Sequence, residues 1–553
     1  MAGYYGWTLA AEFDEERELK RSKVWLCDVK EVYRCPYPFE NWMCLRNFGA
    51  GGMAHGAIYF SVPTEKFSDW LLKDGWNYFG VIVTTEEERK EREPKFREMI
   101  RPWIDDFGKE WGKCVDELMG HYNRLKAVDV EKANDLELQE AFRDWLWAYR
   151  RMAQIHFIAM YAFCCIERLF EELCMELLGI DRNDPLYIKL MSGFDNKTQA
   201  TDGELWRLGD RAKELGLEET FKDIPDDEQL LSKLEESEAG RKWLQELREF
   251  VDEYGWRTRG NWDTFSPSWV EKPSLALTDI RRDMATGGAF VRAQAQQRLR
   301  KERAEAEKEV LSRLPEDKRE WFDKLMRAAQ WAGIVAEEHV FYTENYGNAT
   351  GRRIMKEIEK RFVQAGIIDE PLDVHYLSPD EIDREITIKA DLHKLINIRK
   401  KQHEEFRKAE QPPFIGDPSA IPEMLSADPV VKSTVAAAPR VRPELKADLY
   451  GTVSAPGIVE GIARVVMSEE EFDQVQTGEI LVAVETSAAW TPLFARVKAV
   501  VADVGGVLAH AYIVGREYGL PVVSGTLEAT KKIKTGDRIR VDGDLGVIHI
   551  LGK

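Results

Sequence analysis

At 553 residues the chain is too long for a single hydrophobic core, and its length predicts two to four domains. Its formal net charge of −20 would repel nucleic-acid phosphates, which argues against a nucleic-acid partner. The seven cysteines lack the paired spacing of a zinc or disulfide framework, and we expect no metal site. The longest apolar run, residues 157–166, is shorter than the ~20 residues of a membrane span. Because the N-terminal stretch also differs from a signal peptide, we expect a cytoplasmic protein without a membrane partner.

The first 85 residues are rich in aromatic side chains and glycine, as in "NFGAGGMAHGAIYF". This composition predicts loops and short strands that pack on a helical body. His55 falls among the glycines of this stretch, and we expect it in a flexible loop that a substrate could approach.

From about residue 86 to residue 409 the apolar residues recur at three- and four-residue spacing, which predicts helices. Residues 135–179 form the most apolar part and predict a core helix, or two helices in line. Residues 291–314 alternate opposite charges and predict a solvated surface helix. We therefore expect residues 1–410 to form one mainly helical domain, with residues 1–85 as its mixed part.

A proline-rich segment follows this helical domain. Seven of the 22 prolines of the chain fall between Pro412 and Pro443. Proline fixes the backbone in extended conformations, so residues 411–447 are predicted to be a semi-rigid spacer and hinge.

Beyond the spacer the pattern changes to short β-branched runs bounded by glycine, proline and aspartate. Residues 448–553 therefore predict a small α/β domain. Its clearest helix begins near His510, after the glycine pair Gly505 and Gly506. Free N–H groups and the positive end of the helix dipole favour a phosphoryl group there, and a neutral imidazole is a competent nucleophile.

The C-terminal stretches "GTVSAPGIVEGIARVV", "WTPLFARVKAVVADVGGVLAHAYIVGREYGLPVVSG" and "IKTGDRIRVDGDLGVIHI" resemble the swivelling phosphohistidine domain of the phosphoenolpyruvate-utilising enzymes. The resemblance implies that His510 is the phosphorylated carrier, that Gly505 and Gly506 shape its loop, and that Arg516 lies on the following helix. Hydroxyl residues usually precede the histidine in that family. Here Leu508 and Ala509 stand there, which leaves open how the phosphoryl oxygens are held.

Three pieces of the helical region resemble the acceptor-binding domain of rifampicin phosphotransferase and the large subunit of phenylphosphate synthase. They are residues 190–208, 250–273 and 337–382. The resemblance implies acceptor or phosphate contacts from the arginines of the second and third pieces, which are Arg257, Arg259, Arg352 and Arg353.

Two departures from that family concern the acceptor. Trp256 stands where the family commonly has histidine, which suggests a more aromatic pocket, and Ala336 replaces an arginine beside Glu337. A phenolic acceptor needs a general base because its pKa is near 10. The candidates for this base are Glu337, His55, His156 and His339, although His156 is expected to be a packed core histidine.

The chain lacks the alternating strand and helix units of a phosphoenolpyruvate-binding barrel and lacks a phosphate-binding loop. The resemblance therefore implies an ATP-grasp partner subunit that binds ATP and Mg²⁺ and phosphorylates His510. The acceptor is expected to be a small aromatic compound with a hydroxyl group. Three alternatives stay open: a phosphocarrier or regulatory protein without small-molecule turnover, a phosphoenolpyruvate-binding donor subunit, and a scaffold in which His510 is unused.

Overall fold

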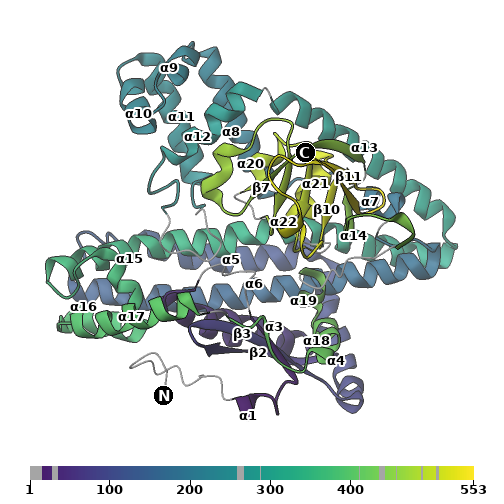
Figure 1. The fold of residues 1–553 in the computed structure, drawn as a ribbon, viewed down its shortest axis with the longest axis horizontal. Helices are drawn as coiled ribbons and strands as arrows, with labels where there is room; N and C mark the ends of the chain where they lie inside the picture. Colours follow the sequence, from purple (N-terminus) through teal and green to yellow (C-terminus); the bar gives the residue numbers. More distant parts are fainter. Residues whose placement is uncertain are drawn as a thin grey trace. The chain divides into compact units, whose positions relative to one another are not determined.

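The computed structural model divides into two compact units (Figure 1). Among the described residues, the first unit holds residues 15–162 and 342–431, and the second holds residues 163–257, 267–341 and 432–552. The structure describes residues 15–27, 35–182, 184–257, 267–286, 288–409, 411–434, 443–455, 457–486, 490–505 and 510–552.

An antiparallel sheet with the strand order β2-β3-β1-β4 lies in the first unit. Its strands are β1 (Val24–Cys27), β2 (Glu65–Lys73), β3 (Trp76–Val83) and β4 (Phe414–Gly416). Asp74 and Gly75 join β2 to β3, and both have positive φ, as a tight hairpin turn requires. The helices of this unit include α4 (Glu86–Asp105), α5 (Phe107–Lys126), α15 (Tyr346–Gln364), α16 (Pro379–Ile388) and α17 (His393–Lys408).

The glycine-rich stretch before β2 is helical, so the expectation of a loop around His55 was wrong. It forms the π-helix η1 (Cys44–Met53) and the helix α3 (Ala54–Phe60). A Cβ atom at Gly49, Gly52 or Gly56 would collide with an aromatic side chain. These glycines therefore allow close helix packing, and the sequence pattern was mistaken for backbone flexibility.

The first half of the predicted spacer is folded rather than extended. β4 pairs with β1, and the segment continues into α18 (Ile421–Ala427) and α19 (Pro429–Thr434). Pro422 lies in the first turn of α18 and Pro429 begins α19, positions where the missing N–H costs nothing. The prolines thus begin helices here. Residues 435–442 lie outside the described residues.

The predicted helical stretch is confirmed, because α4 begins at Glu86 and α17 ends at Lys408. Its most apolar part is a single helix, α6 (Asp135–Leu178), of 44 residues. By length and composition α6 could cross a membrane, yet 78% of its apolar window is buried in the protein, as in a core helix. The other long helices of the second unit are α8 (Lys197–Glu214), α11 (Glu238–Tyr254), α12 (Leu275–Thr286), α13 (Gly288–Arg313) and α14 (Glu316–Val340).

The C-terminal part of the second unit is built on an eight-stranded sheet, drawn in yellow-green and yellow in Figure 1. The strand order is β5-β12-β11-β7-β8-β9-β10-β6, and β7, β8, β9 and β10 run parallel. These four strands are β7 (Ile458–Val466), β8 (Ile480–Ala483), β9 (Ala499–Ala502) and β10 (Val522–Ser524). The outer strands are β5 (Leu449–Tyr450), β6 (Thr452–Ala455), β11 (Arg538–Asp542) and β12 (Val547–Gly552). The predicted C-terminal sheet is confirmed.

Candidate functional site

The candidate site lies at the start of the helix α21 (His510–Tyr518), which packs on the parallel strands. Ala511 and Val514 bury their side chains in the core beneath the helix. A Cβ atom at Gly515 would overlap Val522 of β10, so glycine brings the helix close to the sheet. His510 is therefore fixed near the carboxyl ends of the parallel strands, where α/β domains commonly bind ligands.

Two threonine hydroxyls hold the imidazole of His510. Thr486, which follows β8, lies 2.8 Å from Nδ1, and Thr491, which begins α20 (Thr491–Phe494), lies 3.0 Å from Nε2. In a neutral imidazole one nitrogen donates and the other accepts, so one threonine receives a hydrogen bond and the other gives one. The Phe494 ring packs edge to face against the imidazole, with 5.4 Å between the ring centroids. The ring is thus fixed in position and orientation.

Burial and the nearby Arg257 guanidinium lower the pKa of His510 to about 3. Both effects disfavour the charged imidazolium, although the residue as a whole is half-buried. The ring is neutral at pH 7 and one of its nitrogens keeps a lone pair. This is the protonation state that a nucleophile requires.

Two buried groups of opposite charge come from the helices of the second unit. Arg257 follows α11 and Glu337 lies on α14, with exposed fractions of 8% and 5%. Burial raises the pKa of Glu337 to about 8, against the opposing influence of Arg257. The Arg257 guanidinium lies 6.0 Å from the Trp269 ring. The cation that acts on His510 therefore also acts on a carboxyl group that titrates near neutrality.

The other predicted residues of the second unit have mainly structural surroundings. Trp256 is buried, and its Nε1 donates to the carbonyl of Asp252 at 3.0 Å. Arg516 is buried on α21, with its guanidinium 5.4 Å from the Tyr512 ring. Gly505 has a φ of 150°, which other residues rarely adopt. Gly506, together with Leu508 and Ala509, lies outside the described residues.

The predicted residues of the first unit have partners within that unit. Arg352 forms an ion pair with Glu359 at 3.1 Å, and Arg353 donates to the Val128 carbonyl at 3.5 Å. His55 lies on α3, where burial lowers its pKa. Arg259 lies outside the described residues.

The two remaining histidine candidates are buried. His156 Nδ1 lies 3.3 Å from the Thr343 hydroxyl, and His339 Nδ1 lies 2.9 Å from the Val335 carbonyl. Burial lowers the pKa of His339 to about 4. His156 Nδ1 also lies 3.5 Å from Oε1 of the buried Glu344. Both rings thus already have buried partners, which favours Glu337 among the candidate bases.

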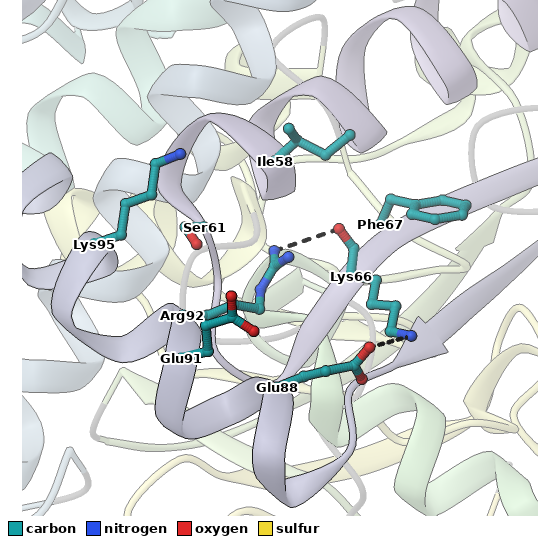
Figure 2. A pocket seen from close by; sticks show the side chains of 8 residues that line it. All are labelled: Ile58, Ser61, Lys66, Phe67, Glu88, Glu91, Arg92 and Lys95. Atoms are coloured by element: carbon teal, nitrogen blue, oxygen red, sulfur yellow. Dashed lines mark hydrogen bonds and ion pairs between the residues drawn. The ribbon is translucent and has the colours of Figure 1, made fainter.

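A pocket of about 470 Å³ opens in the first unit between α3, β2 and α4. Figure 2 shows two of its three cationic side chains engaged: Arg92 donates to the Lys66 carbonyl, and the Lys66 ammonium pairs with Glu88, whereas no bond is drawn for Lys95. Arg92 also donates to the Val62 carbonyl at 2.7 Å. Because two of its three cations are occupied, this pocket offers weaker support for a phosphoryl site than the surroundings of His510.

Two family models match the chain. Residues 151–335 match the rifampicin phosphotransferase fourth domain, and residues 475–546 match the mobile domain of PEP-utilising enzymes. The chain is a relative of the PEP-utilising phosphotransferases. The mobile-domain match contains Thr486, Thr491 and His510, while the fourth-domain match contains Arg257 and ends two residues before Glu337.

Comparison with whole proteins gives the same relationship. The chain is 28% identical to the uncharacterized phosphotransferase YvkC of Bacillus subtilis, over 89% of the chain and 60% of that protein. It is 30% identical to the rifampicin phosphotransferase of Bacillus subtilis, over 59% of the chain and 36% of that protein. It is 29% identical to the prodigiosin synthesizing transferase PigC of Serratia marcescens, over 56% of the chain and 33% of that protein. The chain thus spans 60% or less of the length of these relatives.

Sequence reasoning missed the two threonines of the mobile domain. It looked for hydroxyl groups directly before His510, whereas Thr486 and Thr491 come from the end of β8 and the start of α20. A parallel sheet brings the carboxyl ends of its strands to one edge, so a threonine shortly after β8 was the available signal. The hydroxyl beside the nitrogen that carries a group can contact that group, while the other holds the second nitrogen.

Proposed function

We propose that this chain carries a phosphoryl group on His510 and transfers it to the hydroxyl of a small acceptor. The observation that supports the proposal most strongly is the imidazole held between the Thr486 and Thr491 hydroxyls at the start of α21, where burial and Arg257 lower its pKa. Arg257 is in turn coupled to the buried Glu337. Nucleophile, cation and base are the three functions that phosphoryl transfer to a hydroxyl needs.

In the first half-reaction the ring nitrogen with the lone pair attacks the phosphorus of the donor. A P–N bond forms as the P–O bond to the donor's leaving group breaks. The threonine that donated to this nitrogen turns away, and its hydroxyl becomes available to a phosphoryl oxygen. The other threonine, Thr486 or Thr491, keeps the second nitrogen protonated by accepting its hydrogen bond.

In the second half-reaction the acceptor oxygen attacks phosphorus in line with the P–N bond. Arg257 stabilises the charge on the equatorial oxygens, which dominates catalysis because the transition state is loose. Glu337, as the carboxylate, takes the proton of the acceptor hydroxyl. A new P–O bond forms, the P–N bond breaks, and His510 returns as neutral imidazole.

The donor and acceptor complete the proposal. An ATP-grasp partner subunit binds ATP with Mg²⁺ and supplies the β-phosphoryl group. AMP leaves as the bond between the α- and β-phosphoryl groups breaks, and water takes the γ-phosphoryl group as phosphate. The acceptor is aromatic, as in phenylphosphate synthase, and Trp269 beside Arg257 supports an aromatic ligand. The resemblance of the fourth-domain region to rifampicin phosphotransferases supports the same reaction type.

Labelling tests the proposal directly. The chain, Mg²⁺ and an ATP-grasp partner are incubated with ATP that carries the label on its β-phosphoryl group. We expect acid-labile label on the wild type and on His549→Ala, a control histidine on β12, but none on His510→Ala. Label retained by His510→Ala would refute the carrier role. Label that stays on the protein in the presence of all phenolic acceptors would favour the regulatory phosphocarrier instead.

A further inference from the structure

The stretch "LMSGFDNKTQATDGELWRL", residues 190–208, is not used by the proposed chemistry. It contains the end of α7 (Pro185–Leu190), a connecting loop and the first turns of α8. Its loop and helix meet a different part of α21 from the one that holds His510. The contacts are those of the last turn of that helix.

The connecting loop is rigid, and its conformation requires glycine. Gly193 has a φ of +77°, and a Cβ atom there would lie 2.8 Å from the backbone nitrogen of Arg300. Arg303 of α13 donates to the carbonyls of Ser192 and Gly193 at 2.7 and 2.6 Å. Its guanidinium also lies 4.1 Å from the Phe194 ring. The loop is thereby fixed with the Gly193 N–H directed outward to an acceptor.

That acceptor is the carboxylate of Glu517 on α21. Both of its oxygens lie 3.1 Å from the Gly193 nitrogen, and Gln296 Nε2 donates to one of them at 3.3 Å. Glu517 has an exposed fraction of 3%. A buried carboxylate that receives such hydrogen bonds makes a strong and directional contact.

The next residue of α21 makes a second contact with the same stretch. The Tyr518 hydroxyl donates to Asp202 Oδ2 at 2.9 Å, and Asp202 is buried on α8. Two consecutive side chains therefore join the C-terminal domain to residues 190–208. Neither contact touches His510, which lies seven residues before Glu517, or about 10 Å along an α-helix.

We propose that residues 190–208 are the docking site for the last turn of α21, and that Glu517 and Tyr518 are positioning residues. One rigid helix carries the nucleophile at its first residue and the docking contacts at its end. Docking of the last turn thus holds His510 within electrostatic reach of Arg257. This inference rests on the proposed function, in which the domain must leave this position to collect a phosphoryl group.

Loss of these contacts should affect the two half-reactions differently, because transfer to the acceptor needs the docked state and phosphorylation by the donor needs the undocked state. Glu517→Ala leaves the Gly193 N–H without its acceptor and favours undocking. We expect slower transfer from phosphorylated His510 to an acceptor, and unchanged or faster phosphorylation of His510 by the donor. Tyr518→Phe should act in the same direction, more weakly, because it removes a single hydrogen bond.

The experiment uses the whole chain and needs neither donor subunit nor acceptor. Hydrogen exchange is followed by mass spectrometry in peptides that cover residues 191–196. Separately, phosphoramidate phosphorylates exposed imidazoles with release of ammonia, and its label on His510 is followed over time. We expect both rates to rise in Glu517→Ala, by about tenfold if a charged hydrogen bond is lost. Glu517→Gln, which keeps one acceptor oxygen, should fall in between.

Glu528→Gln and Tyr450→Phe are the matched controls on the same domain, and both should behave as the wild type. If the variants and the wild type have equal melting temperatures, the faster exchange and labelling result from undocking and not from unfolding. Unchanged exchange and labelling in Glu517→Ala and Tyr518→Phe would overturn the docking site. Because both rates are measured without ATP, failure of the proposed phosphotransfer would leave this result intact, and the two failures are distinguishable.

Discussion

Each unit of the molecule buries a cluster of polar side chains with at least one carboxyl group, and the two clusters differ in the neighbours of that group. In the first unit, Tyr161 of α6 donates to Glu65 at 2.9 Å and lies 3.1 Å from Asp428. Asp428 accepts hydrogen bonds from the Val430 and Val431 N–H groups at the start of α19. All three side chains are buried, and they join a strand, a core helix and the segment that leads toward the C-terminal domain.

In the second unit the buried carboxyl group of Glu337 is coupled to Arg257, and Arg257 to His510. In both clusters burial raises the pKa of the carboxyl groups. The first cluster places two acids beside a hydroxyl and backbone N–H groups, and Arg92 acts on Glu65 as Arg257 acts on Glu337. The second cluster differs because its cation also acts on an imidazole nucleophile. A raised pKa alone therefore does not identify a catalytic acid or base, whereas the chemistry of its neighbours does.

Glu337→Gln should have the largest effect of the substitutions considered, and the effect should be on the rate of transfer from phosphorylated His510. Since a base must be deprotonated, and the pKa of Glu337 is about 8, the wild-type transfer rate from phosphorylated His510 should rise with pH toward a plateau above 8. The Gln variant should be slower by about 10²–10⁴ and should lose this pH dependence. Rates of dephosphorylation at saturating acceptor, from pH 6 to 9, test this. An unchanged pH profile in the variant would assign the base elsewhere.

In the first cluster the corresponding substitution should change stability and leave transfer unchanged. The pKa of Asp428 is raised to about 6, so its proton is bound more tightly in the folded chain than in the unfolded one. The contribution of Asp428 to the free energy of unfolding is therefore fully present below pH 4. It decreases by on the order of 2 kcal/mol as the pH rises from about 4 to about 6. Asp428→Asn should remove this part of the pH dependence. Urea denaturation midpoints of both proteins between pH 4 and 7 give the difference, and parallel curves would contradict the prediction.

Much of the fold followed from periodicity, since the helical stretch from Glu86 to Lys408 and the C-terminal strands were predicted. The wrong predictions came from glycine and proline, which each occur in two different structural settings. Glycine around His55 serves close packing, and proline in the spacer begins helices. Tertiary packing decides between these uses, and it is not visible in a local pattern.

At the site, the motif around His510 was sufficient to identify the nucleophile candidate. Arg257 and Glu337 were named from a resemblance, but their coupling depends on the packing of α11 and α14. Thr486, Glu517 and Tyr518 were missed because each acts through contacts with residues distant in sequence. Spacing along the chain gives no information about such pairs.

A smaller effect is expected from Tyr161→Phe, which keeps the ring against Gly56 and removes only the hydroxyl shared by the two acids. A buried acceptor left unsatisfied costs about 1–3 kcal/mol, and a protonated carboxyl group can recover part of this cost by bonding to its neighbour. Tyr59→Phe is the matched control on α3. The urea midpoint should fall for Tyr161→Phe alone, without loss of transfer activity. A fall in transfer at unchanged stability would give the first cluster a catalytic role.

Lys66→Ala should have the smallest effect. Its partner Glu88 is partly exposed at the N-terminus of α4, and an ion pair that solvent reaches contributes little because water and salt screen it. We expect no measurable change in the urea midpoint or in transfer. Because the pocket in Figure 2 contains this ammonium group, a clear loss of transfer in Lys66→Ala would instead mark that pocket as part of the acceptor path. The first unit would then take part in the reaction as well as in the stability of the fold.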